Sequence, residues 1–195
     1  MIHVIHSVRL LGVALLAATV AMVGAGRLHA QDATPLAEAP STAAGAVLHD
    51  TTGRVVGVAL IATGATGTVT VYVAAHGLEP GEHGLHVHET GVCDPTGEKA
   101  FTSAGGHYNP TSAEHGQHAG DLGNITIDAD GFGSVETATD AITLSELLDS
   151  DGAAVVVHAN ADANDAEGKS YGARSACGVL TTTAPQTPEL ATPTS

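Results

Sequence analysis

The sequence predicts an all-β domain, a Greek-key sandwich or barrel of seven or eight short strands. The composition is rich in Gly, Ala, Val and Thr, which suits strands and turns better than helices. Short apolar runs alternate with a period of two, as expected for strands with one buried face. Turns containing Gly and Asp separate these runs, and no long helical period is present.

The predicted strands follow one another through residues 44–182. Ala44–His49 and Arg54–Ala62 flank a hairpin-like connection at residues 50–53, and Gly67–Ala74 alternates Val with Thr or Tyr. The remaining predicted strands are Gly84–Glu89, Gly123–Asp128, Phe132–Ala138, Ala153–His158 and Cys177–Thr181. Thr143–Leu148 is expected to form one helical turn.

The two ends of the chain differ from this domain. Residues 1–30 combine Arg9, an apolar run from Leu10 to Val23 and small residues before Gln31, which is typical of a secretory signal peptide. The run is short for a membrane span, so we expect no stable span after cleavage; a permanent N-terminal anchor is the alternative. Residues 31–43 and 183–195 lack periodicity and are expected to be a flexible linker and a disordered tail.

The chain is strongly acidic, with 6 Lys and Arg against 21 Asp and Glu and a net charge of −15. Removal of residues 1–30 would leave 4 cations against 21 acids, a net charge of −17. Because no basic patch is available to neutralise phosphates, we expect no nucleic-acid partner.

Two cysteines, Cys93 and Cys177, are present, and export to an oxidising compartment would permit a disulfide. They most simply pair with each other. Closing this loop could stabilise the fold by roughly 4 kcal/mol on the chain-entropy model. Cys93 as a metal ligand is the alternative.

Histidines dominate the polar chemistry of the domain. His86 and His88 are two apart on a predicted strand, so both imidazoles project from one face and could form half of a metal site. A chance pair is the alternative in a chain with 12 histidines.

Downstream residues offer two further sets. A Gly- and Pro-rich loop carries an N3O set suited to Zn(II), and His158 could join the first pair and a fourth imidazole in a set suited to copper(II). The loop set is His107, His115, His118 and Asp121. A solvated polar loop is the alternative for this stretch.

Five segments, GLHVHE, GGHYNP, HAGDLGN, VVVHAN and GARSACGV, resemble in order the motifs of the copper/zinc superoxide dismutase family, from about Ala44 to Leu180. The resemblance implies a flattened eight-stranded Greek-key β-barrel with two long active-site loops. It implies copper ligands at His86, His88, His107 and His158, and zinc ligands at His107, His115, His118 and Asp121. His107 would then be an imidazolate bridge between the two ions.

The resemblance also assigns supporting roles. Cys93 and Cys177 would form a disulfide that pins the first active-site loop, and Arg174 would line the copper channel. Asp162 would link a copper ligand to a zinc ligand, expected to be His86 and His115.

The implied function is an exported superoxide dismutase that converts superoxide to oxygen and hydrogen peroxide through Cu(II)/Cu(I) cycling. Periplasm, cell envelope and medium are all open as locations. A non-catalytic dismutase-like protein that binds or delivers copper is the alternative. A homodimer is possible, although the sequence shows no obvious apolar patch.

The chain departs from the family pattern in its loops. Only two residues separate His115 from His118, where many family members have a longer zinc loop. The segment from Asp162 to Arg174 is compact and acidic, with Lys169 its one further cation. Superoxide capture would therefore depend on local positive potential from copper, Arg174 and Lys169.

Three histidines of the domain lie outside these motifs. We expect His49, His76 and His83 to be surface residues. An auxiliary copper-capturing site that uses His83 is the alternative.

Overall fold

The computed structural model describes residues 43–164 and 168–183. The predicted signal peptide, almost all of the linker and nearly all of the predicted tail lie outside the described residues. Within the described ranges, none of the helices is long and apolar enough to cross a membrane.

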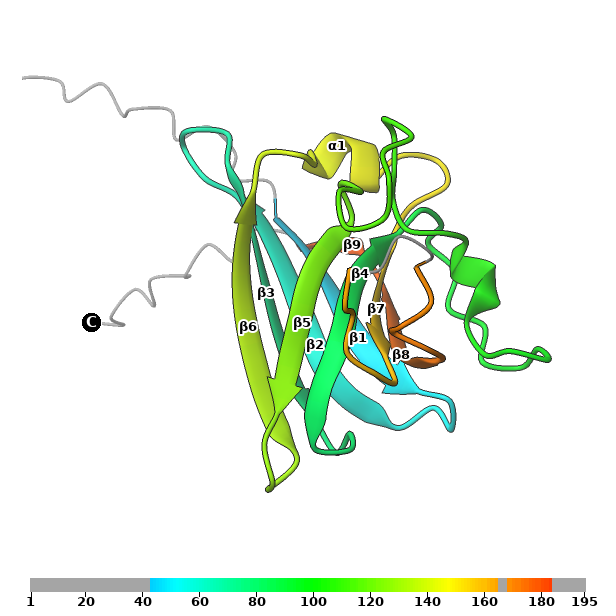
Figure 1. The fold of residues 1–195 in the computed structure, drawn as a ribbon. Coiled ribbons are helices and arrows are strands. Elements are labelled where there is room, and N and C mark those ends of the chain that lie inside the picture. Colours follow the sequence, from blue (N-terminus) through cyan, green and yellow to red (C-terminus); the bar gives the residue numbers. More distant parts are fainter. Residues whose placement is uncertain (1–42, 165–167, 184–195) are drawn as a thin grey trace, which may run out of the picture. The chain divides into compact units, whose positions relative to one another are not determined.

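The described residues form an antiparallel barrel (Figure 1). Its strands are β1 (Ala43–Asp50), β2 (Val55–Thr63), β3 (Val69–His76), β4 (Gly81–His88), β5 (Asp121–Ile127), β6 (Phe132–Thr139), β7 (Ala154–His158), β8 (Arg174–Val179) and β9 (Thr181–Thr183). Their order in the sheet is β5-β4-β7-β8-β1-β2-β3-β6, and β9 pairs with the start of β1. A tight turn joins β5 to β6, and these two strands lie side by side. The predicted eight-stranded all-β fold is confirmed, with β9 as a short addition.

The helical content is small, as the sequence predicts. Helix α1 (Leu144–Leu147) begins after Thr143, whose hydroxyl accepts the Glu146 N–H as an N-cap. A 3-10 turn, η1 (Thr102–Ala104), lies in the long segment between β4 and β5.

Strands β4 and β7 carry three of the histidines. Residues Leu85–His88 of β4 and all of β7 are buried, so side chains on both faces of these strands are held in place. Leu85 and Val87 of β4 point into the main core, so His86 and His88 project from the opposite face of the strand. Val156 of β7 lies on that same side, in a second apolar cluster with Phe101. His158, two residues further on, therefore extends the same face, beneath the loops that cover it.

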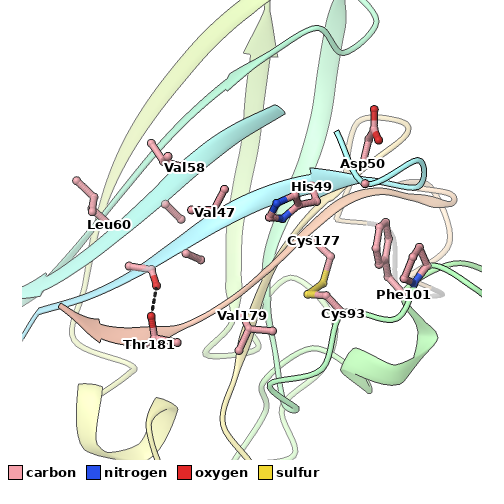
Figure 2. A pocket seen from close by; sticks show the side chains of 15 residues that line it. Val47, His49, Asp50, Val58, Leu60, Cys93, Phe101, Cys177, Val179 and Thr181 are labelled. Atoms are coloured by element: carbon pink, nitrogen blue, oxygen red, sulfur yellow. Dashed lines mark hydrogen bonds between the residues drawn. A yellow bond between two sulfur atoms is a disulfide. The ribbon is translucent and has the colours of Figure 1, made fainter. Parts of the chain in front are cut away.

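A disulfide fixes the first of these loops to the barrel. Cys93 and Cys177 are bonded, with their Cα atoms 5.7 Å apart, as the sequence predicts. Figure 2 shows the bond beside Phe101, which is 1% exposed and packs in the second cluster with Cys177. The loop is thus anchored to β8 both covalently and by packing.

The sequence shows no obvious apolar patch, but the folded chain has one. Val47, Val58 and Leu60 are 41–50% exposed and line a cavity of about 700 Å³ beside the disulfide (Figure 2). These residues come from β1 and β2, where every second side chain points outward. They gather only once the two strands pair, which explains why the linear sequence shows no run.

Candidate metal centre

Four imidazoles meet at the covered face of β4 and β7. His86 and His88 come from β4 and His158 from the end of β7. His107 comes from the loop between β4 and β5, and its backbone pairs with that of His88. One ring nitrogen from each lies within 4.8 Å of the others. We name these residues the four-histidine group: His86, His88, His107 and His158.

The inward nitrogens of this group have no hydrogen-bond partner among the described residues: His86 Nδ1, His88 Nε2, His107 Nε2 and His158 Nε2. The opposite nitrogens are engaged. His88 Nδ1 lies 3.0 Å from the Gly105 carbonyl oxygen, and His158 Nδ1 lies 3.3 Å from that of Gly172. Because a neutral imidazole carries one N–H, donation from the engaged nitrogen leaves a lone pair on the inward one. Four converging lone pairs fit a metal ion that favours an all-nitrogen set.

The protonation of these rings also suits metal binding. Burial lowers the pKa of His86 to about 4, with the neighbouring His107 adding to the effect. Burial likewise lowers the pKa of His158 to about 3 and that of His88 to about 2. The rings of His86, His88 and His158 are therefore neutral near pH 7, and binding a cation requires no proton to leave these three rings.

A second group surrounds Asp121 at the start of β5. Asp121 Oδ1 lies 2.8 Å from His107 Nδ1 and 3.3 Å from His118 Nδ1, while Oδ2 lies 3.9 Å from His115 Nδ1. We name this the Asp121 group: His107, His115, His118 and Asp121. Three imidazole nitrogens and one carboxylate oxygen are the ligand set of many tetrahedral zinc sites.

Backbone groups hold the Asp121 carboxylate in place. Its Oδ2 accepts the N–H of Gly116 at 2.7 Å and that of His118 at 3.0 Å. Burial by itself raises the pKa of this carboxyl, but hydrogen bonds led by the one from His107 outweigh burial and keep the pKa well below its usual value. Asp121 is thus ionised and oriented across the neutral pH range.

His107 belongs to both groups. Its Nδ1 faces Asp121, and its Nε2 is one of the inward nitrogens of the four-histidine group. A single ring can bind two cations in this way once both nitrogens are deprotonated. The two groups are therefore arranged to share one imidazole.

Asp162 connects the groups on their outer side. Its Oδ2 lies 2.7 Å from His86 Nε2 and its Oδ1 lies 3.0 Å from His115 Nε2, with its side chain 1% exposed. Burial favours a higher pKa for this carboxyl, but hydrogen bonds led by the one from His115 hold the pKa below its usual value. A carboxylate bonded to the outer nitrogen of a ligating histidine fixes the ring and its tautomer.

Arg174 and His158, one member of the four-histidine group, line a cavity of about 660 Å³. Arg174 donates from Nη2 to the Gly105 carbonyl oxygen at 2.6 Å and from Nη1 to that of Phe101. The cavity lining includes His158, Tyr171, Arg174 and Lys99. The sequence does not point to Lys99, because no local motif links it to the histidines. Lys169, which the sequence suggested as a source of positive potential, is not among the residues that line this cavity.

The expectation that His83 is a surface residue is wrong. It is 4% exposed, with Nδ1 2.7 Å from the His158 carbonyl oxygen and Nε2 2.8 Å from that of Glu79. Strand β4 begins at Gly81, so His83 lies on the core-facing side with Leu85. With both ring nitrogens against carbonyl oxygens, His83 is unsuited to the auxiliary copper site considered above. His49 and His76 are exposed, as expected.

Known proteins share this sequence pattern. A family model described as copper/zinc superoxide dismutase (SODC) matches residues 55–180. The superoxide dismutase [Cu-Zn] of Mycolicibacterium paratuberculosis is 38% identical over 103 residues, and that of Mycobacterium tuberculosis 40% identical over 108 residues. The matched parts are 49% and 50% of this chain and 45% of each relative, so the match spans less than half the length of these relatives.

Solved structures resemble the fold as well. A double mutant of a SOD-like protein from Bacillus subtilis has a TM-score of 0.62 at 35% identity, covering 70% of this chain and 95% of that one. The Cu/Zn superoxide dismutase from Brucella abortus has a TM-score of 0.61 at 29% identity, covering 71% and 99%. The family model covers well over half of the chain, including both metal-binding groups and both cysteines. The chain therefore belongs to the copper/zinc superoxide dismutase family.

Proposed function

We propose that this protein is a superoxide dismutase. The observation that carries the proposal is the set of four unpaired inward nitrogens joined through His107 to an N3O set. His86, His88, His107 and His158 would hold copper, and His107, His115, His118 and Asp121 would hold zinc. Bound copper would supply one-electron chemistry by alternating between Cu(II) and Cu(I). The balanced reaction converts two superoxide anions and two protons into oxygen and hydrogen peroxide.

The strands supply a rigid frame for this chemistry. His86 is held through Asp162, and His88 and His158 are held through backbone carbonyl oxygens. None of these three rings needs to move to release or take up a proton. Their fixed positions would reduce the reorganisation that accompanies each change of charge.

His107 is the residue placed to handle a proton. Its Nδ1 contacts Asp121 in the Asp121 group. Its Nε2 is therefore the atom that can take up a proton whenever no metal ion is bound to it. That proton is then available to the peroxide product, and solvent supplies the second. A residue that carries protons in this way acts as a general acid and base.

Arg174 and Lys99 would attract the substrate. The chain has a net charge of −15, so its overall field repels an anion. Both cations line the cavity that reaches His158, so they place positive charge locally beside this histidine. We therefore assign anion capture to this cavity.

We also propose that the protein acts outside the cytoplasm. The Cys93–Cys177 disulfide persists in oxidising compartments, and such bonds are rare in the cytosol. The signal-like residues 1–30 point the same way. Accumulation of the full-length, uncleaved chain in the cytoplasm of the producing cell would contradict this placement.

Copper binding without turnover is the second candidate, because solved relatives include a protein described as SOD-like. Metal analysis combined with a superoxide-consumption assay separates the two. We expect one copper and one zinc per chain and rapid consumption. His158→Ala should lose copper and activity, while His76→Ala, a change at an exposed histidine, should keep both. Full copper occupancy without consumption would favour the copper-binding candidate.

A further inference from the structure

Tyr171 lies against both metal-binding groups, although no sequence motif assigns it a role. Its ring centroid is 4.4 Å from that of His158, 5.0 Å from His86 and 5.0 Å from His107. It is also 5.5 Å from that of His115. One aromatic side chain therefore contacts members of the four-histidine group and of the Asp121 group.

The backbone holds this ring in place. The Asn160 N–H donates to the Tyr171 carbonyl oxygen at 3.0 Å, and the Ala159 N–H donates to that of Ala173 at 2.8 Å. The segment after Gly168 is thus paired with the chain that continues from β7. Gly84 provides the space, since a Cβ atom there would lie 3.0 Å from the Tyr171 Cβ, a contact tight enough to displace the ring by a few tenths of an ångström.

The ring stands where the cavity reaches the histidines. His158, Tyr171 and Arg174 line the cavity of about 660 Å³, and His86, His88 and His107 are not among its lining residues. His86 and His88 are 0% exposed. Access from the cavity to the four-histidine group thus passes His158, between the phenol ring and the guanidinium.

We propose that Tyr171 is a specificity-determining residue that limits the size of the anion able to reach the four-histidine group. This inference rests on the proposed copper site. The ring packs against His158, His86 and His107, so the opening toward the group lies between this ring and Arg174. A small anion such as superoxide passes this opening, and a bulky carboxylate does not. Steric exclusion by one side chain can change a selectivity by roughly tenfold or more.

The test compares anion binding in protein loaded with copper and zinc. Azide serves as the small anion and benzoate as the bulky one, and each is titrated while the visible absorption band of copper is followed. Wild type and Tyr171→Phe should bind azide and exclude benzoate, because both keep the ring. Tyr171→Ala should keep its azide affinity and bind benzoate about tenfold more tightly than wild type.

Matched controls separate this role from a structural one. Tyr72→Ala, at an exposed position on β3, should leave both affinities unchanged. Metal content and the copper EPR spectrum should match wild type in Tyr171→Ala, which shows that the site itself is intact. Equal azide-to-benzoate selectivity in Tyr171→Ala and wild type would overturn the inference, whether or not the EPR spectrum changes.

The two proposals fail in different ways. Wild-type protein that binds copper but consumes no superoxide would contradict the dismutase function, while the anion comparison would still decide the role of Tyr171. Wild-type protein that binds no copper would overturn both.

Discussion

Replacing Asp162 by Asn should weaken one of the two metal sites, because the carboxylate holds one histidine of each group. The carboxylate accepts from His86 Nε2 at 2.7 Å and from His115 Nε2 at 3.0 Å. An amide offers one acceptor oxygen, and its NH2 group would face the N–H of the other histidine. One ring therefore loses its partner in a buried position.

The magnitude follows from these contacts. Losing a hydrogen bond to a charged group costs roughly 1.5–3 kcal/mol, which corresponds to a loss of about 10- to 100-fold in affinity. The same range is found when partners of metal-ligating histidines are removed. We expect Asp162→Asn to lower the affinity for copper or zinc by about this factor, measured by competition with a chelator of known affinity.

Asp140→Asn provides the matched control, because Asp140 is exposed and follows the end of β6. It should leave both affinities unchanged. Affinities for both metals within about twofold of wild type in Asp162→Asn would contradict this prediction, since the lost contact would then contribute less than about 0.5 kcal/mol.

Three further predictions concern charge, protonation and the disulfide. Arg174→Ala should lower the superoxide rate roughly tenfold at low ionic strength without removing copper, and an unchanged rate would rule out a capture role. Metal-free protein should lose stability on acidification: burial lowers the pKa of His86 from 6.5 to about 4, so the unfolded chain binds the proton first. The contribution of His86 is fully present above pH 6.5, and about 2 kcal/mol of it is lost by about pH 5; urea unfolding at the two pH values measures this loss. Replacing Cys93 and Cys177 by Ala should lower the free energy of unfolding by roughly 4 kcal/mol, and a change below about 1 kcal/mol would contradict this estimate.

The strands could be predicted because their apolar residues alternate. In β3, Val69, Val71 and Val73 are buried and Tyr72 is exposed, as a period of two requires. The ends of the strands are predicted less accurately, because they depend on where each strand finds a hydrogen-bonding partner. Gly81 extends β4 by pairing with Ile127, and Arg174 opens β8 by pairing with His158.

The metal-binding residues could be proposed because they lie in short motifs, but their neighbours could not. Tyr171 and Lys99 reach the cavity only through the folding of two loops, and neither carries a local pattern. The burial of His83 could not be predicted, because it depends on β4 starting at Gly81, before the predicted strand. In each case a contact between segments distant in the sequence decides the environment of the side chain.

The proposed dismutase function depends on His107 joining a copper ion to a zinc ion. A crystal structure of the oxidised, fully loaded protein tests it most directly, with diffraction recorded at the absorption edges of both metals. We expect copper within the four-histidine group and zinc within the Asp121 group, each bound to one nitrogen of His107. Either metal in the other group, or a His107 ring bound to only one ion, would contradict it.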